Sequence, residues 1–250
     1  MKTFFSVLLV GFLVFPAAAE GRSTPLRVLF IGNSLTFYNE MPSMVERLAE
    51  AAEGQRVETK MIVRGGETFQ RHVERDDEDA PLRVLEKGGW DVVVLQENGR
   101  AAAAREVDSL PPARRLVEAA RRGGAKPIFY MTWSYLHRPE SFAQIQRTYY
   151  LLGSELGVPV APVGEAWRLA REEVPELELF DPDGVHPNTA GSYLAALVLY
   201  SVLFEKDLGT NPHQLSPIGE SAASIPPEKA RQLQLLARDA VKIYPQPASP

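Results

Sequence analysis

Residues 26–36 read LRVLFIGNSLT, and this stretch decides the fold. Its first six residues are apolar apart from Arg27, a composition typical of a buried β-strand. Gly32 then ends the strand, and a polar turn that contains Ser34 follows at once. In open parallel sheets, ligands bind beyond the carboxyl ends of the strands. The turn at Ser34 is therefore the first candidate for a functional position.

Strands and helices are predicted to alternate along the rest of the chain. Further strands are predicted over residues 57–63, 91–96, 127–133 and 158–160. Helices are predicted over residues 42–52, 112–122, 141–156, 164–173, 189–204 and 227–244. The VVVL run inside the third strand indicates burial on both faces, as in a parallel sheet. Repeated β-α-β units predict an α/β fold with helices on both faces of such a sheet.

The composition favours one globular domain and argues against several functions. The chain has 250 residues, 45% of them hydrophobic, which suits a single full-sized core. Its formal net charge is -5, and its basic residues form no cluster interleaved with aromatic residues, which argues against a nucleic-acid partner. The absence of cysteine excludes disulfides, thiolate metal sites and a cysteine nucleophile.

The first 19 residues have the layout of a secretory signal peptide. Lys2 precedes an apolar run that extends to Phe15, and the three alanines at 17–19 offer a cleavage site. An uncleaved anchor is the alternative, but a run of about a dozen residues is shorter than the roughly 20 that span a bilayer. We therefore expect cleavage, export to the periplasm or the medium, and no stable membrane insertion of the single domain over residues 20–250.

Polar residues gather in four segments that follow predicted strands or precede a predicted helix. These segments are residues 32–36 (GNSLT), 65–68 (GGET), 96–99 (QENG) and 181–188 (DPDGVHPN). Because the carboxyl ends of parallel strands lie at one edge of a sheet, we expect the four segments to meet there.

The four segments contain the groups that a serine hydrolase requires. A serine hydroxyl needs a base to accept its proton and a third group to orient that base, roles that suit Ser34, His186 and Asp183. The Ser34 N–H, the Gly66 N–H and the Asn98 amide are candidate donors to an oxyanion. Each residue has a structural alternative when taken alone, because such residues also form turns, cap helices or satisfy loop backbone.

The same segments, in the same order, resemble the signature blocks of the SGNH, or GDSL-like, hydrolases. Residues 32–35 resemble the Gly-Asp-Ser-Leu block that carries the nucleophile, and residues 183–186 are similar to the Asp-x-x-His block. Residues 66–68 resemble the second block, whose glycine contributes an oxyanion N–H, and residues 96–99 stand where the family has Gly-x-Asn-Asp. The resemblance implies a flavodoxin-like, three-layer α/β/α sandwich with a central parallel sheet of about five strands.

Two blocks depart from the family pattern. Asn33 replaces the aspartate beside the nucleophile, and we expect this change to affect local hydrogen bonding rather than the chemistry. In the third block, glutamine and glycine replace the family's glycine and aspartate, so Gln96 is an alternative to Asn98 as oxyanion donor. The choice between Gly65 and Gly66 is open in the same way.

The resemblance implies a serine esterase that needs neither a metal nor an organic cofactor. The family's substrates include carbohydrate acetyl esters, small acyl esters, lysophospholipids and thioesters, and export favours a short acyl group on a glycan. An acyltransferase and a non-catalytic glycan-binding protein are the alternatives. The α/β-hydrolase elbow, Gly-x-Ser-x-Gly, fits less well because Thr36 stands at its last position.

A few further residues have chemistry that the four segments do not account for. His72 is interpreted as a surface or helix-face histidine, with the rim of the site as the alternative. A metal site made of His72, Asp183 and His186 is disfavoured because no ligand motif supports it. Trp133 and Tyr135 follow the fourth predicted strand and are candidates to line a substrate cleft, unless Trp133 belongs to the core. No other substrate-binding residue is assigned.

Overall fold

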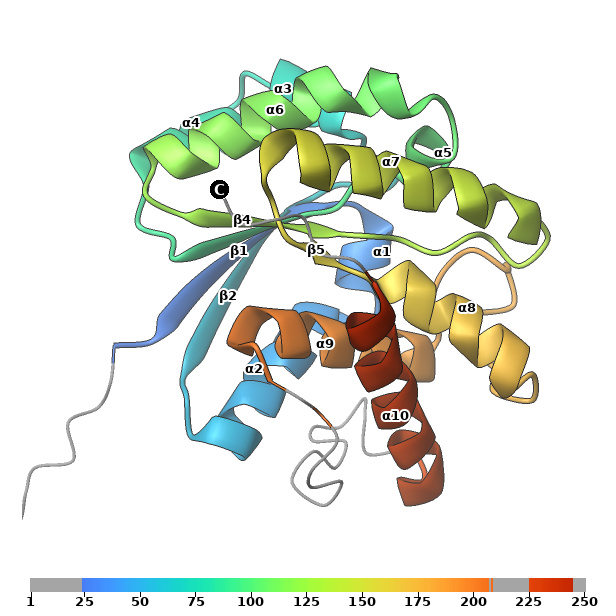
Figure 1. Cartoon of the computed structure of the whole chain (residues 1–250). Coiled ribbons are helices and arrows are strands. Elements are labelled where there is room, and N and C mark those ends of the chain that lie inside the picture. The colour runs from blue at the N-terminus through green and yellow to red at the C-terminus, as the bar shows by residue number, and fades with distance from the viewer. Residues whose placement is uncertain (1–23, 207, 209–224, 245–250) are drawn as a thin grey trace, which may run out of the picture.

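The computed structural model describes residues 24–206, 208 and 225–244 (Figure 1). The predicted signal peptide and the last six residues lie outside the described residues. Within the described part of the chain, no helix combines the length and the apolar character that crossing a bilayer requires.

Five parallel strands of the described chain form one sheet, in the order β2-β1-β3-β4-β5. The strands are β1 (Leu26–Gly32), β2 (Val57–Val63), β3 (Val92–Leu95), β4 (Lys126–Tyr130) and β5 (Val160–Ala161). This order is that of flavodoxin-like folds, and the chain reverses direction along the sheet between β1 and β3. The four residues of β3 are all buried, as the VVVL run predicted. The predicted α/β fold with a parallel sheet is confirmed.

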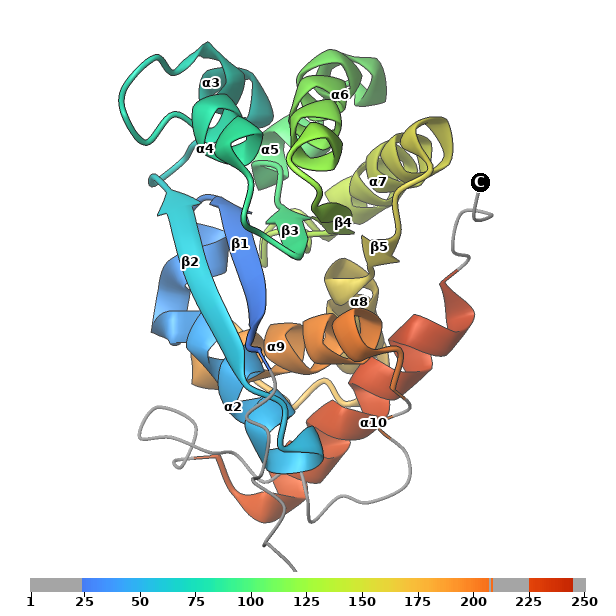
Figure 2. The same cartoon turned by 90° about the vertical axis from the view of Figure 1, so that its left-hand side faces the viewer.

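Helices cover both faces of the sheet, so that the molecule has three layers (Figure 2). One face is covered by α2 (Met41–Glu53), α8 (Val163–Glu173), α9 (Thr189–Phe204) and α10 (Pro227–Ile243). The other is covered by α3 (Phe69–Glu74), α4 (Pro81–Lys87), α5 (Gly99–Ala102), α6 (Glu106–Arg122) and α7 (Phe142–Leu156). The two faces of the sheet therefore each have a hydrophobic core of their own.

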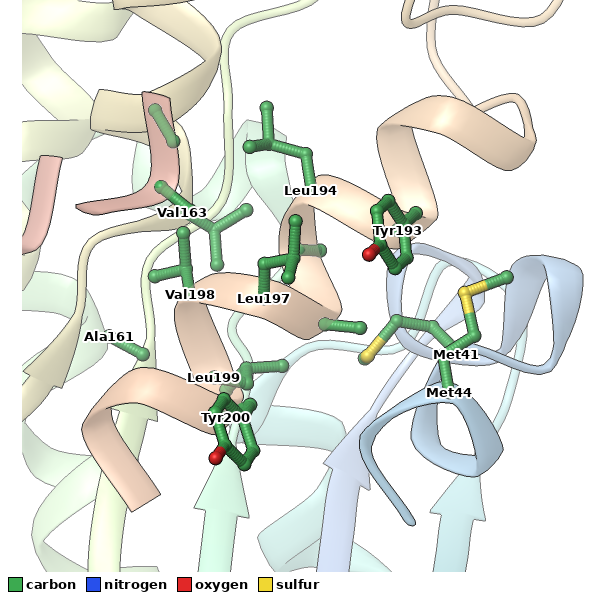
Figure 3. Packing of buried hydrophobic residues seen from close by; sticks show 14 of the residues in the cluster. Met41, Met44, Ala161, Val163, Tyr193, Leu194, Leu197, Val198, Leu199 and Tyr200 are labelled. Atoms are coloured by element: carbon green, nitrogen blue, oxygen red, sulfur yellow. The ribbon is translucent and has the colours of Figure 1, made fainter. Parts of the chain in front are cut away.

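Helix α9 lies at the centre of one of these cores. It is apolar on all sides, as expected of a helix that has no solvent-facing stripe. Asn188 caps its start, since the Asn188 side chain accepts a hydrogen bond of 3.0 Å from the Gly191 N–H. Met41 and Met44 of α2 pack beside Tyr193 of α9 (Figure 3). This packing fixes α9, and with it the segment directly before the helix, against the first part of the chain.

Helices α3, α4 and α6 are among the elements that differ from the sequence prediction. The short helices α3 and α4 were not predicted, although Thr68 caps the first and Pro81 opens the second. Helix α6 begins at Glu106 rather than at residue 112, so that Pro111 and Pro112 lie inside it. Each of these prolines, in the second turn of α6, removes one backbone hydrogen bond, and the buried face farther along the helix outweighs that loss.

Candidate active site

The first polar segment follows β1 directly and presents Ser34 at the carboxyl edge of the sheet. Ser34 is the first residue of the short helix α1 (Ser34–Phe37), which Asn33 caps by accepting a hydrogen bond of 3.1 Å from the Leu35 N–H. The Asn33 amide nitrogen also donates to the Glu67 carbonyl at 2.9 Å. An aspartate could not make this second bond, so asparagine at this position joins the first polar segment to the second.

His186 lies between Ser34 and Asp183. Its Nε2 atom is 2.8 Å from the Ser34 hydroxyl, and its Nδ1 atom is 2.5 Å from an Asp183 carboxylate oxygen. The other Asp183 oxygen accepts the backbone N–H groups of Val185 and His186, both at 2.9 Å. Desolvation raises the pKa of Asp183, but the hydrogen bonds from the His186 ring and from these N–H groups outweigh it and lower the pKa to about 2. Asp183 is therefore a carboxylate over the whole neutral range.

A tight turn brings Asp183 and His186 together. The Asp181 N–H donates to the His186 carbonyl at 2.9 Å, and the Gly184 N–H donates to the Asp181 carbonyl at 3.0 Å. Gly184 has a φ of 67°, a left-handed conformation that glycine adopts without strain. The spacing Asp-x-x-His thus forms one compact loop, whose backbone also holds the Asp183 carboxylate.

The second and third polar segments meet beside the first. Gly66 has a φ of 69°, and its carbonyl accepts a hydrogen bond of 3.2 Å from the Asn98 side-chain nitrogen. Asn98 also caps α5 by accepting from the Arg100 N–H at 2.9 Å. Within the described residues, the backbone N–H groups of Ser34 and Gly66 have no acceptor, and the Asn98 amide nitrogen keeps a second hydrogen. Three donors are thus free to bind a ligand at this edge.

Gln96 is shielded from solvent, and both its side-chain oxygen and its side-chain nitrogen have partners within the protein. It is buried, and its oxygen accepts both the Asn33 N–H and the Thr36 hydroxyl at 2.9 Å. Its nitrogen donates to the Glu97 carbonyl at 2.5 Å. A Cβ atom at Gly32 would lie only 2.5 Å from the Gln96 oxygen, so glycine there is needed for this contact. Of the two candidate oxyanion donors in the third segment, the geometry favours Asn98.

Comparisons with known proteins bear on the family and the fold of the chain. A structure of a protein from Slackia heliotrinireducens, assigned to the SGNH hydrolases, is 30% identical to the chain with a TM-score of 0.63, over 72% of this chain and all of that one. The chain belongs to the SGNH hydrolase family. Two further structures share the fold. A DUF4886 family protein from Bacteroides uniformis has a TM-score of 0.65 at 20% identity, over 88% of this chain and 96% of that one. A lipase/acylhydrolase from Enterococcus faecalis has a TM-score of 0.56 at 17% identity, over 71% and 94%. No protein-family model and no curated protein matches the sequence.

In this SGNH hydrolase, a segment that the sequence did not single out holds His186 in place. The ring of Tyr38 stacks on the His186 ring, with 4.1 Å between centroids and 7° between planes. The Asn39 amide nitrogen donates to the Pro187 carbonyl and to the Ser192 hydroxyl, both at 2.9 Å. Asn39 and Glu40 adopt φ values of 52° and 54°, which are unusual for residues with side chains. Asparagine tolerates a positive φ, so Asn39 was the one residue in the sequence that could have indicated a turn here.

A buried carboxyl supports the donor side of the SGNH site. One oxygen of Glu97 accepts the backbone N–H groups of Phe69 at 2.9 Å and Asn98 at 2.7 Å. Burial raises the pKa of Glu97 to about 7, although these bonds and one from the Ser109 hydroxyl act in the opposite direction. Glu97 therefore fixes the start of α3 and the position of Asn98 together.

His72 lies on α3 and is buried, so of the two predicted settings, surface or helix face, the surface one was wrong. Its Nε2 atom lies 2.9 Å from the Gly32 carbonyl, which can only accept, so Nε2 carries the proton. Its Nδ1 atom has no partner within the described residues. Burial lowers the pKa of His72 by penalising its charged form. His72 thus supports the end of β1, and no group of three acidic or histidine residues in the described chain is placed to hold a metal.

Trp133 and Tyr135 have different surroundings. Trp133 is 1% exposed and stacks on Trp167 with 4.0 Å between ring centroids, so it belongs to the core. Tyr135 is half-buried and lines a cavity that begins at Gly99. Both follow β4, which ends at Tyr130 rather than at residue 133 and so leaves residues 131–138 free to run along the edge of the site. Both aromatic candidates line the cavity beside the third polar segment, and Tyr135 is the more exposed of the two.

Proposed function

We propose that this SGNH hydrolase is an exported serine esterase that cleaves carboxylic esters, with Ser34 as nucleophile, His186 as base and Asp183 as the group that orients the base. The observation that carries the proposal is the unbroken line of hydrogen bonds, 2.8 Å from Ser34 to His186 and 2.5 Å from His186 to Asp183. A nucleophile, a base and an orienting carboxylate at these distances satisfy the geometric requirement for serine catalysis.

In the acylation step, the Ser34 oxygen attacks the ester carbonyl carbon while His186 Nε2 accepts the hydroxyl proton. The carbonyl oxygen becomes negatively charged, and the N–H groups of Ser34 and Gly66 together with the Asn98 amide stabilise that charge. Collapse of the tetrahedral intermediate breaks the bond to the alcohol oxygen, which takes the proton from His186. Asp183 accepts a hydrogen bond from Nδ1 throughout and stabilises the transient imidazolium.

In the deacylation step, a water molecule attacks the acyl-serine ester. His186 accepts a proton from the water, and the same three donors stabilise the second tetrahedral intermediate. The carboxylic acid then leaves, and the proton returns from His186 to the Ser34 oxygen. The same donors thus serve both steps of the proposed reaction.

The substrate we favour is a short acyl group, such as acetyl, on a glycan. Its support is the signal-peptide layout of residues 1–19, which directs the protein to the compartment where glycans of the cell surface and the medium are found. The cleavage of residues 1–19 is itself part of the proposal. Mass spectrometry of the amino terminus of the exported protein tests it directly.

The catalytic proposal is tested by hydrolysis of 4-nitrophenyl acetate. We expect the Ser34→Ala and His186→Ala variants to lose at least about 10³-fold in kcat, because each removes a member of a unit that acts together. Ser154→Ala, an exposed helical serine, is the matched control and should retain full activity. Activity of Ser34→Ala equal to wild type would refute the mechanism. Formation of an acylated sugar when a glycan acceptor is added would instead favour the acyltransferase.

A further inference from the structure

A cavity of about 510 Å³ lies next to the proposed oxyanion donors. It is lined on one side by Gly99 and Arg100, which directly follow Asn98, and on another by Tyr135 and Arg138 from the loop after β4. A Cβ atom at Gly99 would lie 3.2 Å from the Tyr135 ring, so glycine there allows the two walls to approach closely. The volume is within the range of pockets that bind small molecules.

The loop after β4 is attached to the segment that carries Asp183 and His186. The Leu136 N–H donates to the Gly184 carbonyl at 2.8 Å, and the Trp133 ring nitrogen donates to the Val185 carbonyl at 3.2 Å. One wall of the cavity is therefore attached to the segment that carries Asp183 and His186, and the other wall belongs to the segment that carries Asn98. A group bound in the cavity would belong to a substrate that extends from the reacting ester.

The charged residues that line this cavity are all basic. Its lining contains Arg100 and Arg138 but no acidic residue. Within the described chain, neither guanidinium forms an ion pair with a carboxylate, and the partner of Arg100 is the Tyr135 hydroxyl. In the cavity on the other side of Trp133, by contrast, Arg168 is paired with both Glu165 and Glu172.

We infer that the cavity between Asn98 and the loop after β4 is a subsite for a carboxylate carried by the substrate, bound by Arg100 and Arg138. This inference rests on the proposed esterase function and narrows its substrate class to acidic esters. Guanidinium groups bind carboxylates through paired, charge-assisted hydrogen bonds, and the Tyr135 hydroxyl adds a further donor. In a chain whose net charge is -5, two arginines without carboxylate partners at the mouth of the site attract such a substrate selectively.

Two chromogenic ester pairs locate the carboxylate on the acyl or on the alcohol half of the substrate. Mono-4-nitrophenyl adipate is compared with 4-nitrophenyl hexanoate, and 3-carboxy-4-nitrophenyl acetate with its uncharged 3-carbamoyl analogue. For each pair, the kcat/KM of the acidic ester is divided by the kcat/KM of the neutral ester. For at least one pair, we expect this ratio to be about tenfold lower in Arg100→Gln/Arg138→Gln than in wild type. The control Arg83→Gln/Arg114→Gln makes the same change of charge at exposed positions outside the cavity and should leave the ratio unchanged. Unchanged ratios for both pairs in the Arg100→Gln/Arg138→Gln variant would overturn the inference.

A binding measurement separates this inference from the esterase proposal. The monoamide of adipic acid, an analogue of the acyl half, and 3-carboxy-4-nitrophenol, an analogue of the alcohol half, are each titrated calorimetrically into wild type and the two double variants, and an effect on either ligand counts as support. We expect weaker binding only to Arg100→Gln/Arg138→Gln, and a loss of wild-type affinity at high salt. Equal affinity for all three proteins overturns the subsite even if esters are hydrolysed. Absence of all ester hydrolysis refutes the esterase proposal, while the titration still decides whether the carboxylate binds.

Discussion

The two halves of the candidate site are built in different ways. Ser34, His186 and Asp183 contact one another directly, and two of them lie three residues apart in one turn. The donor half, formed by Gly66 and Asn98, comes from two separate loops that buried polar side chains hold in register. The first half is therefore specified by short motifs, whereas the second depends on residues that never touch a substrate.

The largest loss of activity is expected when the carboxylate that orients His186 is replaced. In Asp183→Asn, the side-chain oxygen can still accept the Val185 and His186 N–H groups, which turns the new amide nitrogen toward His186 Nδ1. Nδ1 must then be unprotonated, and Nε2 carries the proton and cannot accept one from Ser34. We expect a loss of about 10³- to 10⁴-fold in kcat.

The control for this variant lies in the same turn. Asp181→Asn keeps the turn's backbone hydrogen bonds, because Asp181 contributes to them through its N–H and carbonyl. It should leave kcat within about twofold of wild type, as for a substitution away from the reacting groups. If Asp183→Asn kept more than a tenth of the wild-type kcat, the orienting role of Asp183 would be wrong.

A smaller effect is expected in the donor half, at Asn98. Asn98→Asp keeps the oxygen that caps α5 but replaces the donor with a group that repels an oxyanion. We expect kcat to fall about 10²- to 10³-fold with little change in KM, because the interaction exists mainly in the transition state. Steady-state kinetics together with a thermal melt separates this effect from unfolding.

Gln96 provides the contrast that tests which residue is the donor. Gln96→Leu leaves the buried Asn33 N–H and Thr36 hydroxyl without their acceptor, which costs about 1–3 kcal/mol for each group. We therefore expect a lower melting temperature as its main consequence. A Gln96→Leu variant of wild-type stability that had lost 10²-fold or more in kcat would reverse the assignment of the two residues.

The contrast between the halves also explains what the sequence could predict. The apolar run before Gly32 and the Asp-x-x-His spacing each act within a few residues, so local pattern was enough to place β1 and to group Asp183 with His186. The contacts of Gln96 with Asn33, of His72 with Gly32 and of Tyr38 with His186 each join residues that are 40 or more positions apart in the chain. A pattern among neighbouring residues does not predict such contacts. The burial of His72 and the stacking of Tyr38 on His186 were accordingly not predicted.

The smallest effect is expected at Glu97, which supports the donor half. It appears as a change in the free energy of unfolding with pH. The pKa of Glu97 is about 7 in the folded protein and near 4.5 when the chain is unfolded. Between these values the folded state retains a proton that the unfolded state has released, so rising pH favours unfolding. Over the whole interval this amounts to about 3 kcal/mol. His72 acts in the opposite direction, because its lowered pKa costs stability as pH falls below 6.5.

Substituting Glu97 isolates its contribution from that of His72. Glu97→Gln stays neutral at every pH, so its free energy of unfolding should rise relative to wild type by up to about 3 kcal/mol between pH 4.5 and pH 7. Urea denaturation at a series of pH values measures the difference, with Glu86→Gln, at an exposed ion pair with Arg122, as the control. A constant difference between Glu97→Gln and wild type would mean that Glu97 is ionised throughout. The N–H groups of Phe69 and Asn98 would then hold a carboxylate, and the donor half would be supported by charge rather than by a neutral acid.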